Sequence, residues 1–148
     1  MAKLSAAVET AENYYDSADA DTFYALIWGG EDIHIGLYQG ANDDIAAASQ
    51  RTIAHMAKQL SVKPEAHILD LDSGFGGASR FLASNHGAHV TALNLSSVEN
   101  ERHRQINERT GLSDSITIID GNFEDIPCPD ERFDIVWSQD PIMHSDTR

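Results

Sequence analysis

Residues 68–77 constrain the fold of this chain more than any other stretch, because a short apolar run ends there in a Gly-rich turn. The run Ile68–Leu71 has the length and composition of a buried strand. Three glycines follow it, at Gly74, Gly76 and Gly77. A helix-like stretch, Ala78–Asn85, comes directly after the turn. A strand, a Gly-rich turn and a helix in this order present backbone N–H groups and a helix N-terminus to a nucleotide-type ligand.

Two acidic residues and one serine narrow the class of ligand. Asp70, near the end of the predicted strand, suits a positively charged adenosyl cofactor better than a pyrophosphate. Counting from Gly74, a dinucleotide fingerprint requires glycine at position 79, where this chain has Ser79, so NAD is disfavoured. Asp72 stands inside the turn at a position where the pattern has glycine. If the cofactor places a carboxylate there, two like charges meet in a poorly solvated site.

Length, charge and cysteine content set the broad class of protein. A chain of 148 residues is one domain by length. Ten basic and twenty-four acidic side chains give a formal charge of −14, which opposes binding to nucleic acid or to an anionic membrane. Without an apolar run of about 18 residues or a signal-peptide pattern, we expect a cytoplasmic protein. The single Cys128 excludes an internal disulfide, and no metal site is expected from the spacing of histidines and cysteines.

The first part of the chain, residues 1–62, is predicted to form a helical cap or lid. Helices are expected at Ala6–Tyr15 and Thr22–Trp28, whereas Asp32–Tyr38 is short and ambiguous. Asn42 can cap a longer helix, Asp43–Leu60. The apolar residues of that helix recur at helical spacing, at Ile45, Ala48, Ile53, Met56 and Leu60.

Residues 63–148 change to an alternation of strands and helices. The predicted strands are His67–Leu71, His89–Leu93, Ser115–Ile119 and Phe133–Trp137. The predicted helices are Gly76–Asn85 and Val98–Thr110; Ser96 with Glu99 forms a capping box before the second, and Gly111 ends it. Such alternation indicates a parallel sheet with crossover helices, so we expect an incomplete Rossmann-like α/β fold of about four parallel strands.

The fourth predicted strand ends at Trp137, eleven residues before the last residue of the sequence. Four strands with two crossover helices make about half of a doubly wound domain, and a parallel sheet requires cover on both faces. We therefore expect this chain to be the first half of a domain, completed by a missing C-terminal half or by a partner such as a second copy.

Polar residues stand at or near the carboxyl ends of the four predicted strands. They are Asp70, Asn94, Asn122 and Gln139. Because ligands of open α/β sheets bind beyond the carboxyl ends of the strands, these side chains are candidates for one site. Asn94 stands where a ribose-binding side chain belongs, and Asn122 could bond an adenine edge while Phe123 covers its face. Asn94 and Asn122 could instead simply turn the chain. His144 is a candidate base or substrate contact, or an ordinary surface histidine.

With these residues the chain resembles a class I S-adenosylmethionine-dependent methyltransferase, and it is most similar to the sarcosine/dimethylglycine N-methyltransferases of betaine synthesis. The first similar segment is aromatic, also seen in sterol methyltransferases, and runs Phe23-Tyr24-Ala25-Leu26-Ile27-Trp28-Gly29-Gly30-Glu31-Asp32-Ile33-His34-Ile35-Gly36. The second is the Gly loop with Asn94-Leu95-Ser96 and Asn100-Glu101-Arg102. The third comprises Asp120–Pro127, Trp137-Ser138-Gln139-Asp140 and Ile142-Met143-His144-Ser145.

The resemblance implies a role for each matching residue. Gly74 and Gly76 would face the methionine part of the cofactor, Asn94 the ribose, and Asn122 and Phe123 the adenine; Asp70 and Leu95 also belong to this cofactor-binding set. Gln139 and Asp140 would line the site near the sulfonium, and Asp140 or His144 would order the amine. A lid would be formed by Tyr15, Tyr24, Trp28 and His34, where aromatic faces suit the cations of the reaction.

The resemblance also implies the reaction. The chain would be the N-terminal portion of an enzyme that transfers a methyl group from S-adenosylmethionine to a small amine such as sarcosine or dimethylglycine. A neutral amine lone pair is required, and positioning supplies most of the catalysis. The alternatives are an inactive or incomplete methyltransferase fragment, and a methyltransferase with another acceptor, such as a sterol or phosphoethanolamine.

Overall fold

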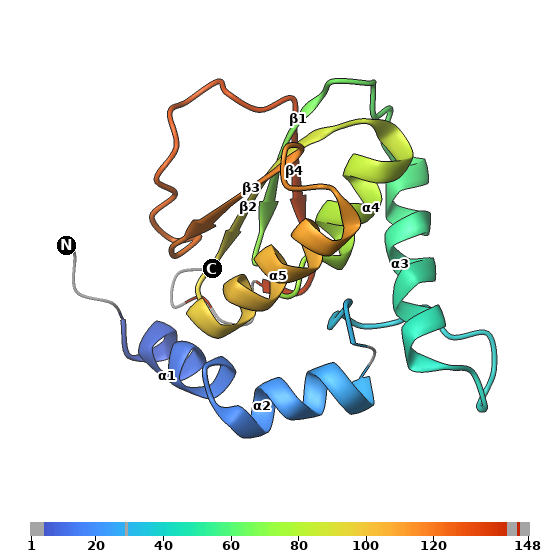
Figure 1. The fold of residues 1–148 in the computed structure, drawn as a ribbon, viewed down its shortest axis with the longest axis vertical. Coiled ribbons are helices and arrows are strands. Elements are labelled where there is room, and N and C mark those ends of the chain that lie inside the picture. Colours follow the sequence, from blue (N-terminus) through green and yellow to red (C-terminus); the bar gives the residue numbers. More distant parts are fainter. Residues whose placement is uncertain (1–4, 29, 142–144, 146–148) are drawn as a thin grey trace.

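The computed structural model describes residues 5–28, 30–141 and 145, and in it helices pack on a small sheet (Figure 1). The N-terminal elements are α1 (Ala6–Tyr15), α2 (Ala18–Phe23), the π-helix η1 (Tyr24–Trp28) and α3 (Ile45–Gln59). Strands and helices then alternate as β1 (His67–Leu71), α4 (Gly77–His86), β2 (His89–Asn94), α5 (Ser97–Thr110), β3 (Ile116–Asp120) and β4 (Ile135–Ser138). We call α1, α2 and η1 together the N-terminal cap.

The four described strands form one parallel sheet in the order β3-β2-β1-β4, as the alternation of elements predicts. Both crossovers, through α4 and α5, step in the same direction, and right-handed connections place these helices on the same face. The chain then returns to add β4 on the other side of β1. The strand order therefore reverses at β1, and the crevice beyond the carboxyl end of β1 is where an open α/β sheet binds its ligand.

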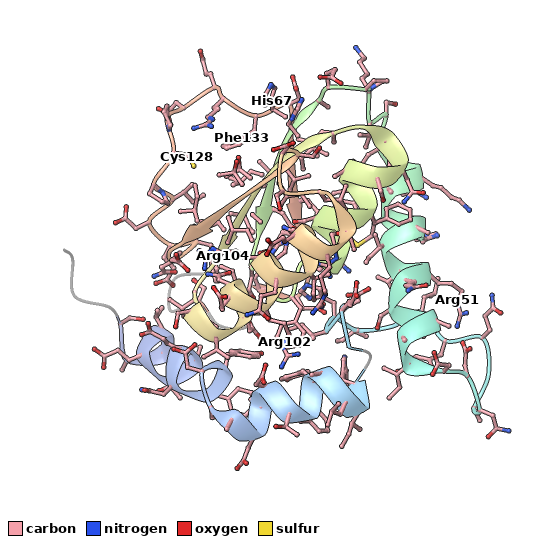
Figure 2. The ribbon with its side chains drawn as sticks, in the orientation of Figure 1. Arg51, His67, Arg102, Arg104, Cys128 and Phe133 are labelled. Carbon is pink, nitrogen blue, oxygen red and sulfur yellow. The ribbon has the colours of Figure 1, made fainter. Side chains whose placement is uncertain are left out.

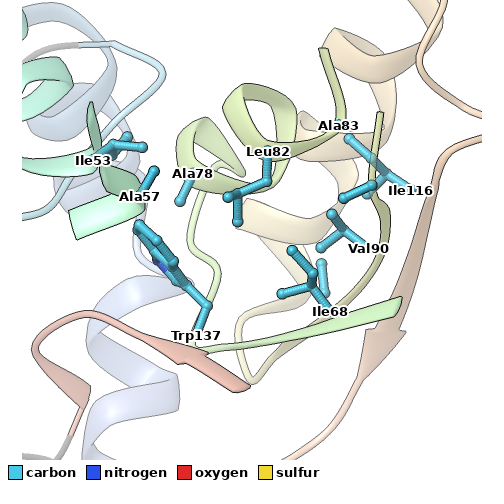
Figure 3. Packing of buried hydrophobic residues seen from close by; sticks show 11 residues of the cluster. Ile53, Ala57, Ile68, Ala78, Leu82, Ala83, Val90, Ile116 and Trp137 are labelled. Carbon is cyan, nitrogen blue, oxygen red and sulfur yellow. The ribbon is translucent and has the colours of Figure 1, made fainter. Parts of the chain in front are cut away.

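The hydrophobic core lies between this sheet and the helices α3 and α4 (Figure 3). Ile53 of α3 and Leu82 of α4 pack with Ile68 and Trp137 of the sheet, and each of these four side chains is at most 2% exposed. Each such aliphatic side chain contributes roughly 1.5–3 kcal/mol by leaving water. Since α3 shares this core, it anchors the N-terminal part of the chain to the sheet.

The bounds of α1 and of the four described strands, and the end of α5, agree closely with the predicted bounds. β1 and α1 have the predicted bounds, and the other strands agree within two residues. Gly111 ends α5 with a left-handed φ of 71°. Ser96 Oγ accepts from the Glu99 N–H at 3.1 Å, which is one half of the predicted capping box. The Glu99 carboxylate, predicted to form the other half, accepts a hydrogen bond from Asn94 Nδ2 at 3.0 Å.

Two predicted N-terminal helices differ from the structure, and the ambiguous segment is resolved. The predicted helix Thr22–Trp28 is divided between α2, which begins at Ala18, and the π-helix η1. The cap residue of α3 is Asp44, whose Oδ2 accepts from the Ala47 N–H at 3.0 Å, so the helix begins two residues later than the sequence suggests. The segment 32–38 is not helical, because its backbone bonds to α3 instead: the Leu37 N–H donates to the Ala48 carbonyl at 2.9 Å. Gly36 allows this approach, since a Cβ there would lie 2.6 Å from Ala48 Cβ.

Candidate active site

Backbone hydrogen bonds from the two residues before Gly74 hold the Gly loop against β2. The N–H groups of Asp72 and Ser73 both donate to the Leu93 carbonyl, at 2.8 and 3.3 Å. Asp72 has φ of 62°, in the left-handed region that favours glycine. Because Asp tolerates this region better than most residues, the backbone keeps the turn expected of a glycine there.

The two glycines predicted to face the cofactor have different surroundings. Two cavities adjoin at Asp72, and Gly74 lines the larger of these two; a Cβ at Gly74 would lie 2.8 Å from Ile33 Cδ1. Gly76 is outside the lining of both cavities. A Cβ at Gly76 would lie 1.9 Å from His103 Nε2, and the His103 ring is fully buried under the loop. Gly76 therefore allows the loop to pack on α5.

The larger cavity measures about 210 Å³ and opens between the N-terminal cap, the Gly loop and the end of β4. It brings together seven residues that the sequence predicts for the site, namely the lid residues Tyr15, Tyr24, Trp28 and His34 with Gly74, Gln139 and Asp140. The smaller cavity measures about 20 Å³ and lies between α1 and the ends of β2 and β3. It brings together four predicted cofactor-binding residues, Asn94, Leu95, Asn122 and Phe123.

Tyr15, Asp72 and Glu99 line both cavities, so they form the wall between them. Glu99 is 4% exposed and holds Asn94, whose Oδ1 in turn accepts from the Gly74 N–H at 3.3 Å. Hydrogen bonds thus connect Glu99, through Asn94, to the Gly loop. The sequence identifies Glu99 as a helix cap only, and its place on the shared wall is not visible from the pattern of α5.

Burial and mutual repulsion raise the pKa of carboxyl groups at and near this wall. Burial raises the pKa of Glu99 to about 8, with Asp72, Asp16 and Asp21 adding to the shift and the Asn94 amide opposing it. Burial also raises the pKa of Asp70 to about 7, against the Ser79 hydroxyl, which donates to Asp70 Oδ2 at 2.6 Å. A cation bound nearby would favour the ionised forms of these carboxyl groups and oppose the shifts.

The aromatic lid residues Tyr15, Tyr24 and Trp28 line the larger cavity and contact one another. Tyr15 stacks on Tyr24 with ring centroids 5.9 Å apart, and Trp28 meets Tyr24 edge-on at 6.0 Å. Burial raises the pKa of Tyr24 to about 12, and it also raises the pKa of Tyr15. Both phenols are therefore neutral at pH 7, and their rings offer the negative face that attracts cations.

His34 and Asp140 lie next to each other in the lining of the same cavity. Asp140 Oδ2 accepts from the Ile35 N–H at 3.1 Å and lies 3.9 Å from His34 Nδ1. Burial lowers the pKa of His34, with the Asp140 charge opposing that shift. A neutral imidazole next to a carboxylate can accept a proton at neutral pH.

The structure also gives the hydrogen bonds or the location of three predicted residues. Asp70 is buried behind the loop and lines neither cavity. Gln139 Oε1 accepts from Trp137 Nε1 at 3.0 Å, and Asn122 Oδ1 accepts from the Glu124 N–H at 2.9 Å in a turn. His144 lies outside the described residues.

Two negative findings concern the described part of the chain. No helix in it is long and apolar enough to span a bilayer. Its His, Cys, Asp and Glu side chains form no group of three or more that could hold a metal ion.

Known proteins are similar to this chain in sequence and in fold. A family model described as mycolic acid cyclopropane synthetase matches residues 2–147. A glycine/sarcosine/dimethylglycine N-methyltransferase from Actinopolyspora halophila is 55% identical over 97% of this chain and 26% of its own length. A sarcosine/dimethylglycine N-methyltransferase from Halorhodospira halochloris is 51% identical over 96% of this chain and 51% of its own length.

A solved structure agrees with these relatives. A proposed sarcosine dimethylglycine methyltransferase from Galdieria sulphuraria superposes with a TM-score of 0.81 at 44% identity, covering 86% of this chain and 50% of that protein. The chain thus spans from about a quarter to about half of the length of the proteins that it matches.

Proposed function

Because the chain belongs to the mycolic acid cyclopropane synthetase family and has the class I S-adenosylmethionine-dependent methyltransferase fold, we propose that it binds S-adenosylmethionine and methylates the nitrogen of a small amino acid such as sarcosine or dimethylglycine. The observation that carries this proposal is the pair of adjoining cavities that share Tyr15, Asp72 and Glu99. One cavity has the residues to hold an adenosine, and the other has the residues to hold cations.

The smaller cavity fits the adenosine end by its chemistry. Val8 and Phe123 give it apolar walls for a base, while Asn94 and Glu99 supply an amide and a carboxylate for the ribose hydroxyls. We propose that Glu99 shares the ribose with Asn94. Its carboxyl group can bond a ribose hydroxyl through Oε1 while Oε2 keeps the Asn94 amide.

The larger cavity fits the reacting end. Tyr24 and Trp28 offer ring faces, and Asp140 a carboxylate, to a sulfonium and to a methylated ammonium product. When bound, S-adenosylmethionine supplies the methyl group, which passes from sulfur to the amine nitrogen and leaves S-adenosylhomocysteine. His34 and Asp140 are placed to take a proton from an ammonium substrate, which frees the lone pair that the transfer requires. The lid rings exclude water from this step.

The proposal is tested by incubating the purified protein with S-adenosylmethionine and either sarcosine or dimethylglycine. Mass spectrometry would follow betaine, dimethylglycine and S-adenosylhomocysteine. Betaine formed from dimethylglycine at the rate of a no-enzyme control would overturn the N-methyltransferase assignment. Phosphoethanolamine and a sterol, added as competing acceptors, distinguish another acceptor from an inactive fragment, which methylates none of them.

Asp72 stands where the pattern of the Gly loop has glycine, and its replacement gives a first prediction. Asp72→Gly is expected to tighten binding of S-adenosylhomocysteine by roughly 1 kcal/mol, because it removes a like charge near the amino-acid carboxylate of the ligand. Isothermal titration calorimetry measures the change. Asp72→Asn is the matched control, since it removes the charge while Asn tolerates the left-handed backbone. Equal affinities of all three proteins would place the Asp72 carboxylate away from the ligand.

We further propose how the described part is completed and where it works. Residues 1–62 would act as the lid through the N-terminal cap. Among the described strands, β4 pairs with β1 alone, and Val136 on it is 60% exposed. This exposed edge supports coverage by further sheet or by a second copy of the chain. A cytoplasmic location is consistent with S-adenosylmethionine and small amino acids as substrates.

A further inference from the structure

The smaller cavity is closed by the N-terminal cap. One of its walls is α1, which contributes Val8, Ala11, Glu12 and Tyr15, and the opposite wall is formed by residues 94–96, 99, 122 and 123. At about 20 Å³ the cavity holds about one water molecule, far less than an adenosine. An adenosyl ligand therefore requires α1, or the side chains that line this cavity, to move apart.

A carboxylate at the end of α1 fixes this helix to the start of α5. Asp16 Oδ1 accepts from Ser96 Oγ at 2.6 Å and from the Val98 N–H at 3.3 Å, and Ser97 Oγ donates to Asp16 Oδ2 at 3.5 Å. At the C-terminus of α1 an acidic residue opposes the dipole of its own helix, whereas at the N-terminus of α5 it is favourable. The acidic residue at position 16 is thus explained by its contacts with the N-terminus of α5.

A second carboxylate fixes α2 to the middle of α5. Arg102 binds Asp21 through two hydrogen bonds, Nε to Oδ1 at 2.9 Å and Nη2 to Oδ2 at 2.6 Å. The same guanidinium lies 5.1 Å from the ring centroid of Phe75 in the Gly loop. Figure 2 shows Arg102 on the side of α5 that faces the cap. A bidentate, half-buried pair of this kind is more rigid than an ordinary surface ion pair.

We propose that Asp16 and Asp21 form a latch that holds the N-terminal cap closed, and that an adenosyl ligand enters and leaves when this latch opens. Ser96 couples the latch to the site, because its hydroxyl donates to Asp16 and also accepts from the Glu99 N–H. Closing therefore fixes the first turn of α5, and Glu99 with it. The identity of the ligand rests on the proposed function, but the latch itself does not.

The latch is tested with Asp16→Asn, Asp21→Asn and the double variant, and with Asp19→Asn as the matched control, since Asp19 is exposed on the same α2 helix. Stopped-flow tryptophan fluorescence follows binding of S-adenosylhomocysteine, which Trp28 reports from the larger cavity. We expect the double variant to raise both the association and the dissociation rate constants about tenfold, as loss of charge-assisted hydrogen bonds predicts. Arg102→Lys, which keeps the charge but loses the bidentate pair, should fall between.

Hydrogen exchange without ligand provides the second readout. Amides of residues 6–28 should exchange about tenfold faster in the double variant, while those of β1 and β2 keep their wild-type rates. A site that was merely damaged would bind more weakly without a faster association rate, and that result, or unchanged exchange in residues 6–28, would overturn the latch. If the wild-type protein does not bind S-adenosylhomocysteine, the proposed function fails, and the exchange result alone decides the latch.

Discussion

Gly76→Ala is expected to destabilise the fold by about 3–5 kcal/mol, through a left-handed backbone forced on alanine and a clash in a packed interior. Gly76 has φ of 82°, and the added Cβ would lie within 2.3 Å of three atoms of the His103 ring. The ring is fully buried, so it has no free space into which to turn. Urea unfolding followed by circular dichroism measures the loss.

Gly87→Ala is the matched control for this variant. Gly87 ends α4 with φ of 66°, but an added Cβ there would have no atom within 4 Å. We expect it to lose only the backbone share, about 1–2 kcal/mol. His103→Ala should restore part of the stability when it is combined with Gly76→Ala, because it removes the obstacle. Equal costs at Gly76 and Gly87 would contradict the packing role of the loop glycine.

The second large effect is a loss of stability as the pH rises. Glu99 has a pKa of about 8 in the folded protein, above the ordinary value of 4.5. Between these two values the folded state keeps a proton that the unfolded state has lost, so the free energy of unfolding falls with increasing pH. The stabilisation is complete below about pH 4.5 and is lost as the pH passes 8. Asp70, with a pKa of about 7 against 3.8, loses its share over a lower range.

Glu99→Gln distinguishes the loss of stability caused by ionisation of Glu99 from the loss caused by general charge repulsion in a chain of net charge −14. The amide keeps an acceptor for Asn94 but does not ionise, so the fall in stability between pH 6 and pH 9 should shrink by a few kcal/mol. Glu108→Gln, exposed on the same helix, removes one charge and should leave the fall unchanged. Urea unfolding at both pH values decides between them. A fall of the same size in all three proteins would show that Glu99 ionises normally.

The order of strands and helices follows from the sequence because local pattern and tertiary structure agree there. Ile68–Leu71 is apolar, short and followed by glycines, so a buried strand is the one element that satisfies it. The stretch from Thr22 to Trp28 carries helical periodicity but no signal for a π-helix, and the structure divides it between α2 and η1. The segment 32–38 carries a weak pattern, and contacts to α3 decide its path.

The site could be predicted where it depends on strand ends, and not where it depends on α5. Asn94 and Gln139 are located by the rule that ligands bind at the carboxyl ends of strands. Glu99 and His103 lie on a helix that is polar along most of its length, and a polar residue in such a helix is normally exposed. Their burial arises from the Gly loop and the N-terminal cap, which are distant in sequence.

The contacts that close the cap also set the order in which the protein can fold during synthesis. Asp16 and Asp21 are separated from Ser96 and Arg102 by 80 and 81 residues. At about 5–20 residues per second, the ribosome completes α5 roughly 4–16 s after the cap has been made. The N-terminal cap is therefore synthesised seconds before the helix on which its two carboxylates dock.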